Sequence, residues 1–238
     1  LGALQMSGGA LDGAGTLTLQ RSGSTWTAGT VSGGLTLGLG TNATLGISNG
    51  NPTLTASNLS NAGAVNFAPA NYVILNGPGG TLTNLSGGLW DFQNNTAFSV
   101  SGTWAFDNQA GATVRKSTTT GTLSFALPLT NAGTVEVAGG IFSLDGGGSS
   151  TGLFDLAAGS TLKFNSNFTL GAGSTVSTTG LLELTGGILT LARGSAFAPA
   201  TNFTFTSGTL TGADDFSTAS GNTTTWKSGI MSGSGVTK

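Results

Sequence analysis

The residues of this chain that could perform acid–base chemistry are its nine carboxylates, of which only Asp214 and Asp215 are adjacent. Paired acids of this kind supply the acid and the nucleophile of glycoside hydrolysis. Adjacent residues of a strand point to opposite faces, so these two carboxylates converge only if they lie in a turn. The sequence has no histidine and no cysteine, which removes the usual acid–base group at neutral pH and all thiol chemistry. We therefore expect no catalytic residue, and a polysaccharide-active enzyme is the less favoured alternative.

A metal or cofactor site is also not expected. Asp145 and the three glycines after it resemble the aspartate–glycine repeats that bind calcium, but those need a nonapeptide repeated several times. Here the motif occurs once. Glu136, Asp155, Lys163 and Glu183 alternate with apolar neighbours, which predicts outward positions suited to ion pairs or to solvation.

The four tryptophans are the candidate binding residues. Trp90 and Trp104 are possible ligand contacts, because an exposed indole stacks on a sugar ring. The other reading is structural, since a buried indole fills a wide section of core. Trp26 and Trp226 occupy equivalent places in a long repeat, which favours a structural role for both.

Composition excludes several function classes. Glycine accounts for 42 of 238 residues, only 7% are charged, and the net charge is −2. Soluble domains average about 25% charged residues. Arg115 and Lys116 are the only adjacent cations, so nucleic-acid binding, which needs many phosphate contacts, is not expected. No apolar run approaches the roughly 20 residues of a membrane span.

Short alternating segments recur along the chain and predict an all-β fold. Examples are 134–137 (TVEV), 161–164 (TLKF) and 181–184 (LLEL), each with the period of two that marks a half-buried strand. Strands of four residues, separated by turns of two to six, are too short and too close for a sandwich. They are typical of a β-solenoid, in which each strand pairs with its equivalent one coil above and below. We predict a right-handed parallel β-solenoid (β-helix) of 11–12 coils, about 55 Å long.

Gly- and Asn-rich turns separate these strands. The related passages at 61–65 (NAGAV) and 131–135 (NAGTV) assign turns to Asn61, Gly63, Asn131 and Gly133. Glycine and asparagine tolerate the left-handed backbone that a tight corner needs. The proline-containing stretches 68–80 and 193–202 are expected to be loops.

A long-period repeat relates residues 7–33 to 207–233. Trp26, Gly29, Ser32 and Gly33 recur as Trp226, Gly229, Ser232 and Gly233, an offset of 200. We therefore expect 1–238 to be a single β-solenoid segment, a slice of a longer repetitive protein.

Residues 108–164, 186–191 and 224–235 resemble the repeat regions of very large bacterial surface and secreted proteins, the filamentous-haemagglutinin and autotransporter-passenger type of β-solenoid. The resemblance implies an extracellular or cell-surface location and adhesion, biofilm or filament roles. It carries over no catalytic motif.

We accordingly expect a structural rod, stalk or filament-forming module of a bacterial extracellular protein. Its partners would be copies of itself, joined end to end or side by side into fibres, because an open solenoid end exposes unpaired strand edges. The alternative is an adhesin that binds host glycan or protein.

Overall fold

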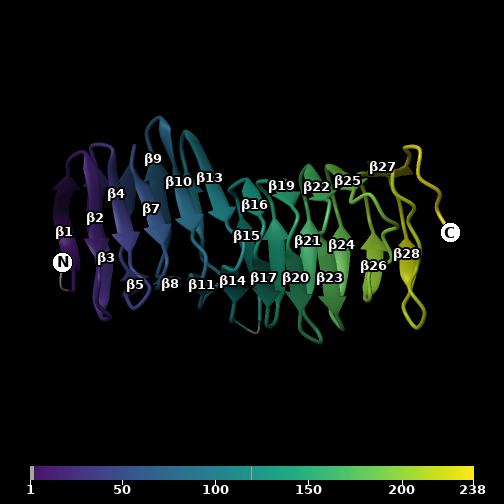
Figure 1. The fold of residues 1–238 in the computed structure, drawn as a ribbon, viewed down its shortest axis with the longest axis horizontal. Coiled ribbons are helices and arrows are strands. Elements are labelled where there is room, and N and C mark those ends of the chain that lie inside the picture. Colours follow the sequence, from purple (N-terminus) through teal and green to yellow (C-terminus); the bar gives the residue numbers. More distant parts are fainter. Residues whose placement is uncertain (1–2, 119) are drawn as a thin grey trace.

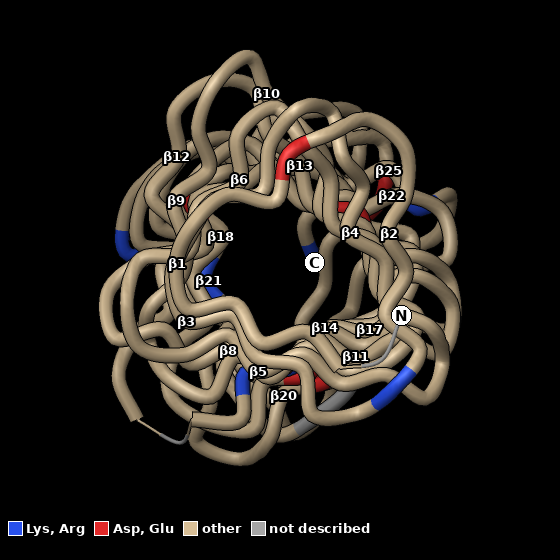
Figure 2. Tube along the Cα trace, turned by 90° about the vertical axis from the view of Figure 1, so that its left-hand side faces the viewer, with Lys and Arg blue, Asp and Glu red and all other residues tan. Residues whose placement is uncertain are grey.

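The chain is wound into a β-solenoid of about 11 coils with no helix among the residues described (Figure 1). The computed structural model describes residues 3–118 and 120–238, and residues 177 and 178 by their backbone alone. Viewed from its N-terminal end, the chain turns clockwise as it recedes (Figure 2), so the solenoid is right-handed. The predicted fold class is confirmed.

All strands of the described residues pair in parallel and form three sheets. The 12-stranded sheet contains β12 (Phe98–Val100), β9 (Val73–Asn76), β6 (Thr53–Thr55), β3 (Ser24–Ser32), β5 (Thr44–Asn49), β8 (Ala64–Pro69), β11 (Leu89–Phe92), β14 (Thr113–Lys116), β17 (Thr134–Val137), β20 (Leu153–Leu156) and β23 (Thr175–Thr178), with β1 (Gln5–Asp12) paired to β3. The 11-stranded sheet contains β2 (Gly15–Leu19), β4 (Leu35–Leu39), β7 (Asn58–Asn61), β10 (Gly79–Asn84), β13 (Thr103–Asn108), β16 (Leu129–Asn131), β19 (Gly148–Ser150), β22 (Phe168–Gly171), β25 (Ile188–Ala192), β27 (Thr209–Gly212) and β29 (Ile230–Met231). The six-stranded sheet contains β15 (Thr122–Phe125), β18 (Ile141–Leu144), β21 (Thr161–Phe164), β24 (Leu181–Leu184), β26 (Asn202–Phe205) and β28 (Thr224–Trp226).

Each central coil contributes one strand to each of three sides. The long strand β3 bends around a corner, pairing with β5 through its first half and with β6 through its second. The β6–β9–β12 ladder therefore belongs to the 12-stranded sheet although it lies on a different side from β5. That ladder ends at β12, and β15 starts a new one on the same side.

Coil length varies along the rod. The paired residues Ala64 and Leu89 are 25 positions apart, whereas Thr134 and Leu153 are 19 apart. Aromatic side chains fill much of the core, where the rings of Trp90 and Phe106 meet edge to face with centroids 5.0 Å apart. Burial of one such side chain stabilises the fold by roughly 1.5–3 kcal/mol.

The core also contains a ladder of four buried asparagines. Asn61, Asn84, Asn108 and Asn131 end successive strands of the 11-stranded sheet and lie in register. Each Nδ2 donates to the Oδ1 of the next at 2.8, 2.9 and 2.8 Å, and Asn131 continues the chain to Ser150 Oγ at 3.0 Å. Asn84, Asn108 and Asn131 have ladder partners on both sides, and the Oδ1 of Asn61 accepts the Gly63 N–H instead, so these polar groups are buried without the cost of lost hydrogen bonds.

The asparagines also fasten the corner that follows them. The second Nδ2 hydrogen of Asn61, Asn84 and Asn108 is donated across the corner to a carbonyl of the 12-stranded sheet, at 2.9–3.0 Å; these acceptors are Leu89, Thr113 and Thr134. The ladder thus ties two sheets together at each coil.

The expected left-handed backbone at these corners is not found. Neither Asn61 nor Asn131 has a positive φ, and neither do Gly63 and Gly133. Asn61 instead turns its side chain inward and accepts the Gly63 N–H at 3.0 Å. A Cβ on Gly63 would collide with carbonyl oxygens of the preceding coil, as would one on Gly133. Glycine is required here by the close approach of two coils.

One of the two expected loops contains a strand. Within 68–80, β9 occupies Val73–Asn76 and pairs with both β6 and β12. The other stretch, 193–202, is irregular apart from an isolated bridge between Phe197 and Phe216 and the start of β26. Proline thus marks corners of a continuous coil rather than excursions from it.

We expect Asn84→Ala to lower the free energy of unfolding by about 2–4 kcal/mol, because it leaves buried groups of Asn61 and Asn108 without a partner. Urea denaturation measures the loss. Asn66→Ala is the matched control: Asn66 lies outside the core on β8 and contacts Gln93 at 3.4 Å, so it should cost less than about 0.5 kcal/mol. Equal losses in the two variants would show that the ladder has no special role.

Candidate functional site

Trp90 and Trp104 are core residues, with 1% and 3% of their surface exposed. Trp104 donates its Nε1–H to the carbonyl of Ser101 at 3.2 Å and packs over Gly80, where a Cβ would meet the indole ring. The Trp90 ring packs against Phe67, Phe98 and Phe106 in a wide coil. Neither indole has an exposed face on which a sugar ring could stack. Trp90 and Trp104 therefore fill the core and are not the ligand contacts that the sequence suggested.

The two tryptophans of the long repeat lie in different environments. Trp26 in β3 is fully buried between β1 and β5, whereas 57% of the surface of Trp226 in β28 is exposed. The following corners match, since Gly29 and Gly229 both have φ near 100°, at 94° and 103°. The copies nevertheless occupy different sheets, the 12-stranded and the six-stranded. Trp226 is exposed because no strand among the described residues covers β28 on its far side.

Asp214 and Asp215 do not converge. Asp214 accepts the backbone N–H groups of Arg193 and Gly194 in the preceding coil. Asp215 accepts Val236 N–H at 2.9 Å and the Lys238 ammonium at 2.7 Å in the following coil. The hydrogen bond from Lys238 lowers the pKa of Asp215, with help from Val236.

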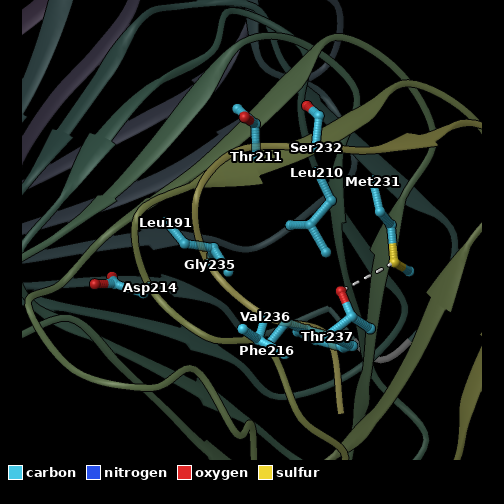
Figure 3. A pocket seen from close by; sticks show the side chains of 10 residues that line it. All are labelled: Leu191, Leu210, Thr211, Asp214, Phe216, Met231, Ser232, Gly235, Val236 and Thr237. Atoms are coloured by element: carbon cyan, nitrogen blue, oxygen red, sulfur yellow. Dashed lines mark hydrogen bonds between the residues drawn. The ribbon is translucent and has the colours of Figure 1, made fainter.

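A small cavity lies beside Asp214, lined by apolar core residues and turn residues (Figure 3). Its volume is about 20 Å³, which is room for about one water molecule. The two acids therefore join successive coils, and the space next to them does not accommodate a saccharide.

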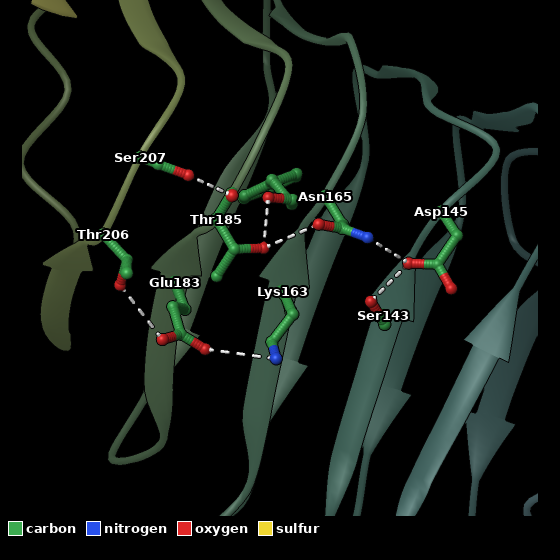
Figure 4. A network of polar contacts seen from close by, with 9 residues as sticks. Ser143, Asp145, Lys163, Asn165, Glu183, Thr185, Thr206 and Ser207 are labelled. Carbon is green, nitrogen blue, oxygen red and sulfur yellow. Dashed lines mark hydrogen bonds and ion pairs between the residues drawn. The ribbon is translucent and has the colours of Figure 1, made fainter. Parts of the chain in front are cut away.

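Asp145 belongs to a row of polar side chains that crosses the coils (Figure 4). Its Oδ1 accepts Ser143 Oγ–H at 2.6 Å and Asn165 Nδ2–H at 3.1 Å, and Asn165 Oδ1 accepts Thr185 Oγ1–H at 3.0 Å. Within the described residues no group of three histidine, cysteine or acidic side chains could hold a metal ion. In a parallel row, Lys163 and Glu183 form an ion pair at 3.6 Å.

A second acidic pair escaped the sequence analysis, because its members are 19 positions apart. Glu136 in β17 and Asp155 in β20 are direct partners in register and line a hollow of about 270 Å³ on the outer surface. Glu136 is neutralised by Arg115 in the coil before it, Nε to Oε2 at 2.9 Å. The pair would have been found by comparing residues one coil apart instead of neighbours in the chain.

Lys116 was also missed. The alternation along β14 predicts it, since Val114 points inward, Arg115 outward and Lys116 inward. Lys116 is fully buried and stands between Phe92 and Val137 in a core stack.

The Lys116 ammonium donates to three carbonyls, those of Thr118 at 2.7 Å, Gly139 at 3.0 Å and Thr120 at 3.3 Å. It thereby holds the segment that leads into β15, where the six-stranded sheet begins. Burial lowers the pKa of Lys116, because desolvation disfavours the charged form.

A hollow of ligand-binding size lies farther toward the N-terminus. It is lined by Asn51, Asn71, Tyr72, Ile74 and Ser99 and has a volume of about 330 Å³, within the range of small-molecule pockets. These residues come from the coils of β6, β9 and β12. Figure 1 shows that the corners that follow β9 and precede β13 project beyond the neighbouring coils.

The register of the sheet fixes the shape of this hollow. Ile74 pairs with Thr53 on one side and with Ser99 on the other. Ile74 points outward because Val73 and Leu75 point into the core. Neighbouring strands are about 4.8 Å apart, so the hollow spans roughly 10 Å along the rod.

The rim of the hollow is polar and aromatic. Tyr72 is the only tyrosine of the chain, and 55% of its surface is exposed. Asn51 and Asn71 are also exposed, and within the described part of the chain no hydrogen bond engages either side-chain amide. The sequence signal for this hollow was a lone tyrosine next to an asparagine at a corner. Strand periodicity gives no information about such a residue, because it lies outside the alternating segments.

Comparisons with protein-family models, curated proteins and solved structures gave no match for this chain. Among the residues that the structure describes, no helix has the length and apolarity to cross a membrane.

Stability should rise with pH in the alkaline range through Lys116. Because its pKa is lower in the folded state, the unfolded chain binds more protons between that pKa and the ordinary value near 10.5. The slope contributed is at most about 1.4 kcal/mol per pH unit. We expect Lys116→Met to flatten the pH dependence of unfolding, measured by urea denaturation from neutral pH to about pH 10.5.

The test is the slope of unfolding free energy against pH, and not the stability at a single pH. Lys116→Met removes a buried charge and three hydrogen bonds at once, and these two losses have opposite effects on stability. Lys227→Met is the control, because Lys227 is exposed and should leave the slope as in the wild type. A slope unchanged in Lys116→Met would mean that this ammonium does not titrate with folding.

Proposed function

We propose that this chain is a structural rod, serving as a stalk or filament-forming module of a bacterial extracellular protein. The observation that carries the proposal is the continuity of one core. A single cluster of buried apolar side chains runs from Met6 to Phe216, and the parallel ladders run beside it through coil after coil. Such a stack gains length by adding coils, each held by its neighbours.

Side-chain rows reinforce the rod along its axis. The asparagine ladder links four coils inside the core, and the Asp145 row and the ion pair between Arg115 and Glu136 cross coils on the outside. Buried, fully partnered polar rows define one register, because a slip by one residue would break every rung. This favours a stiff element over a flexible linker.

The last described coil has uncovered apolar side chains, which a further coil of the same chain or of another copy would bury. The Trp226 ring lies parallel to Phe205, 8° between planes and 6.1 Å between centroids, and its other side is exposed. Ile230 and Val236 are exposed in the same coil. Unpaired strand edges combined with exposed apolar groups favour pairing with a further coil. The extracellular and bacterial setting rests on the sequence resemblance.

Binding of host glycan or protein is the second candidate function, and the hollow at Tyr72 is the specific observation that favours it.

Electron microscopy and small-angle scattering of the purified chain test the rod. About 11 coils at roughly 4.8 Å each give a particle about 50 Å long. We expect such particles at low concentration and end-joined fibres at high concentration. Compact particles at every concentration would overturn the proposal.

Trp226→Glu combined with Ile230→Glu should weaken end-to-end association by at least about tenfold, because charges replace apolar groups that an added coil would bury. Sedimentation velocity over a concentration series measures the effect.

Ile188→Glu is the matched control. Ile188 is an exposed apolar residue at the start of β25, on the side of the rod and away from the last coil. If this change abolishes association while the double variant does not, the rods join side by side and the end-to-end mode is wrong.

A further inference from the structure

We infer that the hollow formed by Asn51, Asn71, Tyr72, Ile74 and Ser99 is a binding site for a neutral saccharide of one or two residues. The inference goes beyond the proposed rod, since a rod needs no such hollow. It rests on the shape, exposure and chemistry of these five side chains.

The lining groups complement the two faces of a sugar ring. A pyranose presents apolar C–H groups on its faces and hydroxyls around its edge. The exposed Tyr72 ring offers an aromatic face for the C–H groups, and Ile74 adds an apolar surface. Each asparagine amide has two donors and an acceptor, which match a pair of neighbouring hydroxyls. Ser99 adds a hydroxyl that both donates and accepts.

The amides have capacity for a ligand. In the part of the chain that the structure describes, no hydrogen bond engages the side-chain amide of Asn51 or Asn71. This contrasts with Asn61 and Asn84, whose amides are saturated within the core ladder. Asparagines thus have two roles in this chain, one in the core ladder and one at the surface. At the hollow, a ligand's hydroxyls would replace only water at the amides of Asn51 and Asn71.

The charge of the lining selects the ligand class. The five lining residues include no aspartate, glutamate, lysine, arginine or histidine. The hollow at Glu136 and Asp155, in contrast, is lined by two carboxylates. A sulfated or sialylated sugar would find no cation at the Tyr72 hollow, so a neutral saccharide is the fitting ligand.

The support beneath the hollow is rigid. Ile74 and Ser99 lie on paired strands, β9 and β12, and the backbone before them is fastened by the Val73 N–H to Ala97 carbonyl bond at 3.2 Å. Little ordering is therefore needed on binding, which preserves affinity for a shallow site. Repetition of the site along a fibre would raise avidity further.

The test titrates the 238-residue chain with lactose, maltose, cellobiose and N,N′-diacetylchitobiose up to about 10 mM, by calorimetry and saturation-transfer NMR. Sialyllactose and a sulfated heparin disaccharide serve as charged probes. We expect at least one neutral disaccharide to bind with a dissociation constant on the order of 1 mM. The charged probes should bind at least about tenfold more weakly.

Tyr72→Ala should weaken binding at least about tenfold, whereas Tyr72→Phe, which keeps the ring, should stay within about threefold. Asn71→Ala should weaken binding by about three- to tenfold. Ile188→Ala is the matched control, since Ile188 is also an exposed apolar residue and lies outside the hollow. Thermal unfolding should be unchanged in the Tyr72 variants, because the side chain is at the surface.

Absence of binding by every neutral probe would overturn the inference, as would binding that persists in Tyr72→Ala or binding confined to the charged probes. These outcomes leave the rod untouched, because its own test reads particle shape and fibre formation.

Discussion

The structure depends on one constraint, which is that each coil must match the coils on both sides of it position for position. Parallel ladders give every interior strand its hydrogen bonds from two neighbours, so no coil is stable alone. The same register places like side chains over like, as in the stack of Phe67, Phe92 and Val137 interrupted by Lys116. A change at one position is therefore felt by the coils above and below it before it affects anything else.

The asparagine ladder and Lys116 enter this core where the stack itself supplies their partners, whereas the buried Nε1–H of Trp90 has no hydrogen-bond partner among the described residues. The asparagine ladder satisfies this condition, because each amide donates to the next coil and those of Asn84, Asn108 and Asn131 accept from the coil before. Lys116 satisfies it differently, since its ammonium donates to two carbonyls of the adjacent chain and to the Gly139 carbonyl of the next coil. Those carbonyls include Thr118 and Thr120, which lie in the segment where the β12 ladder has ended and the β15 ladder begins. A buried cation thus accompanies the main irregularity of the rod.

The fold could be predicted from sequence because alternation is local: segments such as 134–137 and 161–164 show which side chains point inward without reference to anything distant. The candidate site could not be predicted, because which residues lie side by side in a solenoid depends on coil length. That length changes from 25 to 19 positions along the chain. Glu136 and Asp155 meet at one such offset, and Tyr72 reaches Ser99 across another. The burial of a side chain could not be predicted either, since Trp26 and Trp226 share a sequence context but lie in different sheets, and only Trp26 is covered on both sides.

Variation in coil length also explains where a rod can carry specific chemistry. A ladder needs a fixed set of inward positions, and residues beyond that set must leave the coil at its corners. The 25-residue spacing between Ala64 and Leu89 includes Asn71 and Tyr72 at the corner before β9, and the corner after β9 projects beyond the neighbouring coils (Figure 1). Where the spacing falls to 19, between Thr134 and Leu153, Glu136 pairs with Arg115 and lines a hollow of about 270 Å³ together with Asp155. The long coil thus carries a neutral hollow built partly from a corner, and the short coil carries an acidic hollow built from strand residues in register.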